Sequence, residues 1–308
     1  MITAAGCTIS LDSREQADFF FVSHAHSDHI AGVHKGSKIV ASPETIELIS
    51  ATYGIESKKN DDFSEKCNAS MLDAGHMLGS KQLFIEDLQE GKAIVYTGDF
   101  QMEKSRTVKP IEIKEADVAI VDSTYPYPEV IFEEKSKVEE SIAKWTSKAM
   151  EKGIVLFGAY KMGKAQELIS ILNSNGIMPW VSKGILNINK VYEKNGIRLN
   201  YLSTYKDDSL EGGNFVGISE SRDIRQLGHM LEKIHGKRVY TAVVTGFAKT
   251  MHFGTDMQFA LSDHADFKQT VEYINDVHAK EIVAYGKNSK IMAANLARMG
   301  INATPFDR

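Results

Sequence analysis

The segment 23–29, Ser-His-Ala-His-Ser-Asp-His, gathers four side chains that can bind metal ions. It directly follows the apolar stretch DFFFV, which is typical of a buried strand. His24 and His26 are two residues apart in an extended segment, so both project to the same side and can bind one cation. Asp28 and His29 follow where a helix would begin, and there they can reach a second cation. The spacing therefore predicts a site for one or two metal ions.

Two later apolar strands are followed by residues that can also bind a metal ion, His76 after one strand and Asp99 after the other. Each has small residues before the candidate ligand, which lets the backbone approach a crowded site. Taken singly, His76 fits a polar core residue and Gly98-Asp99 fits a turn. Their position after the histidine segment favours a common site instead.

The elements around these residues predict an α/β protein. Up to about residue 122 the chain reads as short strands separated by turn-forming residues. From residue 133 strands alternate with expected helices, which cover 136–153, 164–176, 221–236, 266–279 and 289–300. A strand-rich half followed by an alternating half indicates sheets layered with helices, and the change near residue 125 is the expected edge of an insertion.

The composition fits a globular chain with ample core. Of 308 residues, 43% are apolar and 25% charged, and no apolar run approaches the roughly 20 residues that span a bilayer. We therefore expect a cytoplasmic protein with no membrane partner. Cys7 and Cys67 lack CxxC spacing, so we expect small core residues and neither a disulfide scaffold nor a thiolate zinc site.

Charge is unevenly distributed along the chain. The formal net charge is -5, but 126–255 holds 18 Lys and Arg against 14 Asp and Glu, which makes it the more basic part. Such a segment could guide a polyanion toward an acidic metal site. Ordinary surface scatter explains so small an excess equally well.

The metal-binding residues resemble those of the metallo-β-lactamase superfamily. In that family an early Asp, HxHxDH, a later His and a later Asp surround one or two zinc ions. The resemblance implies an αβ/βα sandwich in which Asp12 steadies the histidine loop. It also implies this ligand set: His24, His26 and His76 for the first zinc, Asp28 and His29 for the second, and Asp99 as the bridge. Such a pair activates water and neutralises phosphate oxygens.

Three further segments resemble the β-CASP branch of that superfamily, which includes RNase J and Artemis and acts on nucleic acids. They are 121–125 (VDSTY), 159–164 (AYKMGK) and 262–267 (SDHADF). The resemblance covers nearly the whole chain. It implies a core formed by 1–125 and 256–308, and a smaller inserted α/β cap of the β-CASP type over 126–255.

Four of these residues have readable roles. Asp122 beside His264 favours the charged imidazolium, so His264 is a candidate general acid for the leaving oxygen. Read alone, they are a strand-end carboxylate and a neighbour of a helix cap. Lys161 and Lys164 sit at an expected helix N-terminus, a site suited to phosphate, although a tight strand-to-helix turn fits as well.

The chain departs from the family pattern at one position. The family usually supplies another histidine to the second zinc near the C-terminus, and here that position reads Tyr285-Gly-Lys287. A phenol with a pKa of about 10 is a poor ligand. We therefore expect a weaker or empty second site, with Tyr285 and Lys287 facing substrate and Lys287 adding positive charge.

These observations predict a zinc-dependent nuclease for single-stranded RNA or DNA, in RNA processing or DNA repair. Two alternatives stay open. One is a nucleic-acid-binding subunit of the same fold that has lost turnover, and the other is a small-molecule hydrolase such as a thioesterase or lactonase. The intact Asp122 and His264 disfavour the first, and the cap disfavours the second. The sequence decides neither RNA against DNA, nor exonuclease against endonuclease, nor whether the chain forms a homo-oligomer.

Overall fold

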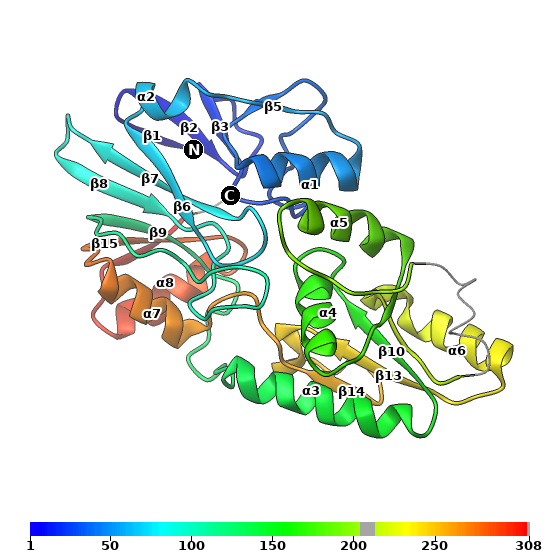
Figure 1. Cartoon of the computed structure of the whole chain (residues 1–308). Helices are drawn as coiled ribbons and strands as arrows, with labels where there is room; N and C mark the ends of the chain where they lie inside the picture. The colour runs from blue at the N-terminus through cyan, green and yellow to red at the C-terminus, as the bar shows by residue number, and fades with distance from the viewer. Residues whose placement is uncertain (204–212, 307–308) are drawn as a thin grey trace. The chain divides into compact units, whose positions relative to one another are not determined.

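The structure is a computed structural model that describes residues 1–203 and 213–306 (Figure 1). The chain divides into two compact units. Both combine helices with sheets, which confirms the predicted α/β class. The first unit comprises Met1–Lys104, Val108–Ile131 and His264–Arg308, and the second comprises Ser105–Thr107 and Phe132–Asp263.

The division between the units falls after Ile131 and after Asp263, slightly later than the 125/126 and 255/256 boundaries expected from sequence. The second difference has a structural cause. Strand β14 (Met257–Phe259) pairs in parallel with β13 (Val239–Val244), so it completes the sheet of the second unit. The boundary expected at 255/256 would have left this strand in the core.

The first unit is built on a six-stranded sheet in the order β16-β15-β9-β8-β7-β6. Its strands are β6 (Ala69–Asp73), β7 (Lys81–Asp87), β8 (Lys92–Tyr96), β9 (Val118–Asp122), β15 (Glu281–Tyr285) and β16 (Ala303–Phe306). A three-stranded sheet contains β1 (Ile2–Ala4), β2 (Cys7–Leu11) and β3 (Phe19–Phe21), and a short pair contains β4 (Lys38–Ile39) and β5 (Lys58–Lys59). The helices are α1 (Pro43–Tyr53), α2 (Phe63–Lys66), α7 (Phe267–Asp276) and α8 (Ser289–Arg298).

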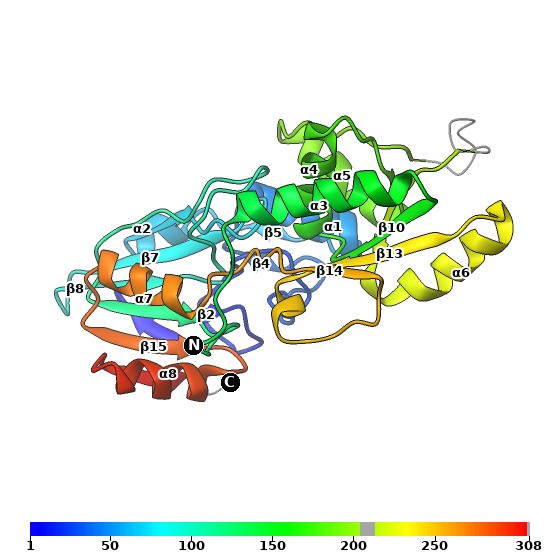
Figure 2. The ribbon, with the colours of Figure 1, turned by 90° about the horizontal axis from the view of Figure 1, so that it is seen from below.

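The six-stranded sheet is buried on both faces, because its strands direct apolar side chains alternately to one face and to the other. Tyr96 and Ile120 point into one core cluster that also holds Ile9 and Phe21 of the three-stranded sheet. On the other face, Val95 and its neighbours pack with residues of α7 and α8. Figures 1 and 2 show these two helices side by side along the sheet. This layering fixes the strand ends that carry the candidate ligands.

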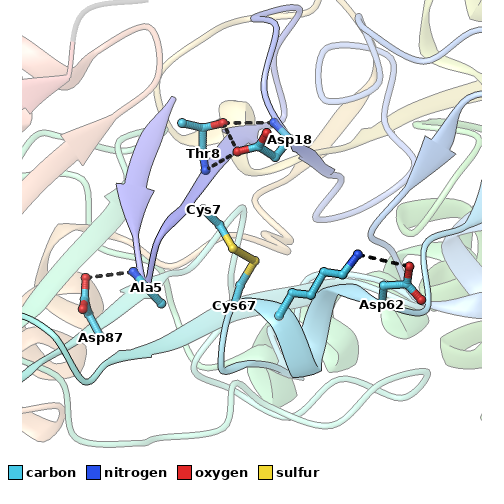
Figure 3. The surroundings of a disulfide bond; sticks show 8 residues. Ala5, Cys7, Thr8, Asp18, Asp62, Cys67 and Asp87 are labelled. Atoms are coloured by element: carbon cyan, nitrogen blue, oxygen red, sulfur yellow. Dashed lines mark hydrogen bonds and ion pairs between the residues drawn. A yellow bond between two sulfur atoms is a disulfide. The ribbon is translucent and has the colours of Figure 1, made fainter.

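Cys7 and Cys67 form a disulfide, which corrects the expectation of two separate core cysteines (Figure 3). The bond ties β2 to the residue that ends α2, across a sequence separation of 60 residues. Both residues are buried, as expected. The absence of CxxC spacing did not exclude this disulfide, because the two cysteines are distant in sequence and meet only when α2 packs beside the three-stranded sheet.

Two features bear on the predicted location. Disulfides are typical of oxidising compartments and are rare in the cytosol of most organisms. Within 1–203 and 213–306, no helix is both long and apolar enough to cross a bilayer. A cytoplasmic location therefore stays a prediction, and the disulfide weighs against it.

The second unit is a parallel sheet in the order β11-β12-β10-β13-β14. Besides β13 and β14, its strands are β10 (Ile154–Ala159), β11 (Trp180–Val181) and β12 (Val216–Glu220). Its helices are α3 (Lys135–Met150), α4 (Lys164–Ser174), α5 (Lys183–Lys194) and α6 (Ile224–His235), and the turns η2 (Ser221–Asp223) and η3 (Gly246–Lys249) are 3-10 helices. Strand β10 is fully buried at the centre, as its unbroken apolar run predicts.

Candidate metal centre

Strand direction brings three of the predicted residues to one edge of the six-stranded sheet. β7 is antiparallel to both β6 and β8, and β8 is parallel to β9, so β6, β8 and β9 all end at the same edge. His76 follows β6, Asp99 follows β8, and Asp122 is the last residue of β9. The candidate catalytic and metal-binding side chains therefore lie together at this edge, where the loops after these strands meet.

The histidine segment reaches this edge from the three-stranded sheet. It follows β3, and the backbone of Ser23 accepts a hydrogen bond from the N–H of Lys81 at the start of β7. Gly98 allows the closest approach, with a φ of +56°. A Cβ added there would lie 2.6 Å from the Ser23 Cβ, so a larger residue would push the two loops apart. This confirms the reason for expecting small residues before Asp99.

Four ligand atoms converge on one point. His24 Nε2 lies 3.0 Å from His26 Nδ1, which lies 3.2 Å from His76 Nε2. Asp99 Oδ2 lies 3.4 Å from His24 Nε2 and 3.9 Å from His76 Nε2. Ligands around a tetrahedral zinc ion with Zn–N bonds of 2.0–2.1 Å are about 3.3 Å apart. The four separations, from 3.0 to 3.9 Å, are thus near the spacing that a tetrahedral zinc site requires.

The proton of His24 is placed by its neighbours. Ser23 Oγ donates its single hydrogen to Asp12 Oδ2 at 2.6 Å, so it can only accept from His24 Nδ1, 2.9 Å away. The proton therefore sits on Nδ1, and Nε2 presents a lone pair to the other ligands. Burial and the neighbouring His29 hold the pKa of His24 well below its usual value, which keeps the ring neutral as a metal ligand must be.

Asp12 organises the loop from beneath, as predicted. Its carboxylate is 2% exposed and also accepts hydrogen bonds from the Ser23 N–H at 2.7 Å, from His29 Nδ1 at 2.7 Å and from the Tyr96 hydroxyl at 2.7 Å. The bond to His29 fixes the orientation of that ring and turns Nε2 toward Asp99, 3.3 Å away. Burial opposes the charge of His29, but the Asp99 and Asp12 carboxylates outweigh it and raise its pKa.

Asp99 faces residues of both predicted metal sites. Oδ2 faces the first cluster and also His29 Nε2 and His264 Nε2, the latter at 4.0 Å. Burial disfavours its charge, but His29 and His264 hold the pKa of Asp99 well below the usual range. It is therefore ionised at neutral pH, as a bridging carboxylate must be.

The second set of predicted ligands is looser. Asp28 Oδ2 lies 3.6 Å from His29 Nε2, and the Asp28 side chain is 73% exposed. Within the described residues, neither Asp28 nor His29 belongs to a group whose ligand atoms all lie within 4.8 Å of one another. The geometry therefore supports the first metal site more strongly than the second.

Asp122 and His264 meet beside the cluster, although they are 142 residues apart in sequence. Asp122 Oδ2 lies 3.0 Å from His264 Nδ1, and Thr124 donates to the other carboxylate oxygen. The His264 backbone is held by Gln101, whose side chain donates to the His264 carbonyl at 2.9 Å. With Nδ1 engaged, Nε2 is the ring atom that faces Asp99.

Tyr285 does not face these residues, which corrects its expected contact with substrate. Its side chain is buried in the core cluster between the two sheets, with its ring against Tyr96 and Phe306. The hydroxyl donates to the Leu11 carbonyl at 2.7 Å. A buried phenol in this position cannot touch substrate. Lys287 is exposed just beyond β15, and its role stays a prediction.

The two predicted phosphate-binding lysines belong to the second unit. Lys161 lies half-buried before α4, and Lys164 is the first residue of that helix. Lys164 is 2% exposed, with Nζ 3.2 Å from Asp263 Oδ1. Burial lowers its pKa, and Asp263 opposes that shift. Lys164 is thus already paired within the unit, which leaves Lys161 as the more accessible candidate, and both roles stay predictions.

Sequence reasoning missed two residues of the centre, Ser23 and Tyr96. Both bind the Asp12 carboxylate, and Ser23 also orients His24. A signal for Ser23 was its place directly before the first histidine. Tyr96 gave no signal, because a tyrosine that ends an apolar strand reads as core.

A scan against models of known protein families gave no match. Curated relatives that are similar in sequence include a bacterial and an archaeal protein. A "Probable DNA ligase" of Opitutus terrae is 28% identical over 296 residues, which is 92% of this chain and 28% of the relative. An "RNase J-like protein" of Methanocaldococcus jannaschii is 30% identical over 185 residues, or 51% of this chain and 44% of the relative. The chain thus spans less than half the length of either relative.

A solved structure supports the fold. A crystal structure of a protein of unknown function from Enterococcus faecalis V583 matches 94% of this chain and 79% of its own length. The TM-score is 0.59 at 12% sequence identity. At this identity the likeness concerns the fold alone.

Proposed function

Because this chain belongs to the metallo-β-lactamase superfamily and to its β-CASP branch, we propose that it is a zinc-dependent nuclease acting on single-stranded nucleic acid. The observation that carries the proposal is the convergence of His24, His26, His76 and Asp99 beside the Asp122–His264 pair. We also propose that the two units are an αβ/βα sandwich and its β-CASP cap.

The residues present fit zinc. Three imidazole nitrogens and a carboxylate oxygen are ligands that zinc prefers, and their spacing matches a tetrahedral ion. His24, His26 and His76 would hold the first ion, with Asp99 as the bridge to a second ion held by His29 and Asp28. Bound zinc lowers the pKa of water and neutralises phosphate oxygens.

The chain's own residues supply the proton of the reaction. Asp122 accepts the Nδ1 proton of His264 and so fixes the ring, which leaves Nε2 to donate a proton to the departing oxygen. Asp12 and Ser23 hold His24 and His29 in place through buried hydrogen bonds. The proton donor of the proposed reaction thus has its orientation fixed by a second residue.

We favour DNA over RNA as the substrate. The relative that matches 92% of this chain, the second unit included, is named as a DNA ligase, whereas the RNase J-like relative matches only 51%. This likeness supports DNA repair as the setting of the proposed activity.

The test is cleavage of labelled single-stranded DNA and RNA of matched sequence by zinc-loaded protein, with zinc per chain measured in each sample. The variant His24→Ala/His26→Ala should lose both zinc and cleavage. A matched control, His34→Ala/His229→Ala, changes two exposed histidines and should keep both. A zinc-bearing wild type that binds both strands and cuts neither contradicts the proposal.

A further inference from the structure

A groove of about 510 Å³ opens in the second unit, with α3 on one side and β14 and Lys249 of η3 on the other. Figure 2 shows α3 running alongside β13 and β14. The volume falls within the range of about 300–1,000 Å³ that is usual for ligand pockets. The lining residues that matter here are Lys144, Lys148, Lys249, Trp145, Met257 and Phe259.

The wall formed by α3 repeats at helical spacing. Lys144 and Lys148 are four residues apart, and Ser141 and Trp145 lie on the same face. A sequence stripe with this spacing reads as a solvated helix surface. In the structure Lys249 lines the same groove, so three lysines border one hollow.

The three lysines are free to bind an anion. Across residues 1–203 and 213–306, Lys144, Lys148 and Lys249 have no carboxylate within ion-pair distance and no side-chain hydrogen bond. All three are exposed. Glu133 is the one acidic side chain among the residues that line the groove. The hollow therefore carries a net positive charge, which attracts a polyanion.

Trp145 adds a surface for a flat ring. Its indole is half-buried and packs edge to face against Phe157 and Phe259, with ring centroids 5.7 and 5.8 Å away. These contacts hold the indole in place before any ligand arrives. Base-on-aromatic stacking contributes about 1–3 kcal/mol per base and tolerates any sequence.

We propose that this groove binds a short stretch of single-stranded DNA, with a base stacked on Trp145 and phosphates against Lys144, Lys148 and Lys249. The inference rests on the proposed nuclease function and adds a strand-binding site in the second unit. A base inside a duplex is already stacked on both faces, so Trp145 selects an unpaired strand.

The test measures binding of labelled dT20 to the full chain in the presence of a chelator, which prevents cleavage. The groove variant is Lys144→Gln/Lys148→Gln/Lys249→Gln. The control, Lys183→Gln/Lys190→Gln/Lys233→Gln, removes the same charge from exposed lysines of the same unit that do not line the groove. We expect the groove variant to bind at least about tenfold more weakly than the control. For the groove variant, the slope of the logarithm of the binding constant against the logarithm of the salt concentration should become less steep by about 2, since each contact with a single-strand phosphate contributes about 0.7.

Tryptophan fluorescence gives a second readout that does not depend on removing Trp145. The chain has two tryptophans, and Trp180 is only 3% exposed. In a Trp180→Phe protein, dT20 should quench the remaining emission through stacking. Trp145→Ala should weaken binding about 5- to 150-fold, and Trp145→Phe, which preserves packing, should weaken it less.

The outcomes separate this inference from the proposed nuclease. Equal dT20 affinity in the groove and control variants, without quenching, overturns the groove even if the protein cuts DNA. Quenching and selective loss of binding support the groove even if no cleavage occurs, which would contradict only the nuclease. Tighter binding of rU20 than dT20, or equal quenching by polyglutamate, overturns the assignment to single-stranded DNA.

Discussion

Replacing Asp12 with asparagine should disable the metal centre without touching a ligand. The buried Asp12 carboxylate accepts four hydrogen bonds, three of them at Oδ2, from Ser23 Oγ, His29 Nδ1 and the Tyr96 hydroxyl. Asparagine keeps one carbonyl oxygen for the Ser23 N–H but presents an amino group to those three donors. The change therefore keeps the shape of the side chain but removes its negative charge and the acceptor of these three hydrogen bonds.

The magnitude follows from the three donors that lose their acceptor. A buried donor without a partner costs about 1–3 kcal/mol, and the two hydroxyls can rotate, so we expect a loss of about 3 kcal/mol in the free energy of unfolding. Loss of a hydrogen bond that orients a metal-binding histidine lowers metal affinity about 10- to 100-fold. Asn also tolerates the φ of +46° at this position, so backbone strain adds little.

The assay is urea unfolding of metal-free protein together with zinc titration against a chromogenic chelator. Asp18→Asn is the matched control, because the exposed Asp18 carboxylate accepts two hydrogen bonds from Thr8. It should change stability by less than about 0.5 kcal/mol and leave zinc affinity unaltered. If Asp12→Asn behaves like Asp18→Asn in both measurements, the buried network does not hold the ligands as argued.

Four further variants should have three distinct effects. Asp122→Asn and His264→Ala should each slow DNA cleavage about 10²- to 10⁴-fold in single-turnover assays with zinc content retained, and loss of zinc would assign them to metal binding instead. Cys7→Ser/Cys67→Ser should lower the free energy of unfolding by about 4 kcal/mol in urea, because the bond closes a loop across 60 residues; equal urea midpoints would refute this. Tyr285→His should add no zinc by elemental analysis and should cost about 1 kcal/mol from the lost hydroxyl bond, whereas a gain of zinc would show that position 285 reaches the metal.

Much of the candidate site could be predicted because the ends of strands can be recognised in the sequence. Apolar runs that end in His76, Asp99 and Asp122 indicate where strands stop, and strands that run the same way in one sheet bring such residues together. The face on which a strand residue lies is harder to predict. In β15, Ala284 joins the helix-covered face and Tyr285 joins the opposite core, so a shift of one residue in register would exchange them.

Other features depend on tertiary contacts that no local pattern records. Helix α5 was not predicted, since Gly184, Asn187 and Asn189 are poor helix formers and its stability comes from buried residues such as Tyr192. The Cys7–Cys67 bond depends on where α2 packs. The groove of the second unit likewise needs Lys249 to be brought beside α3.

The most direct measurement is a crystal structure of the zinc-loaded protein with an anomalous difference map at the zinc edge. We predict a peak about 2.0–2.1 Å from His24 Nε2, His26 Nδ1 and His76 Nε2, with Asp99 Oδ2 completing the site. No peak among these atoms, in protein that still cuts DNA in the same zinc-containing buffer, would contradict a metal centre as the source of the activity.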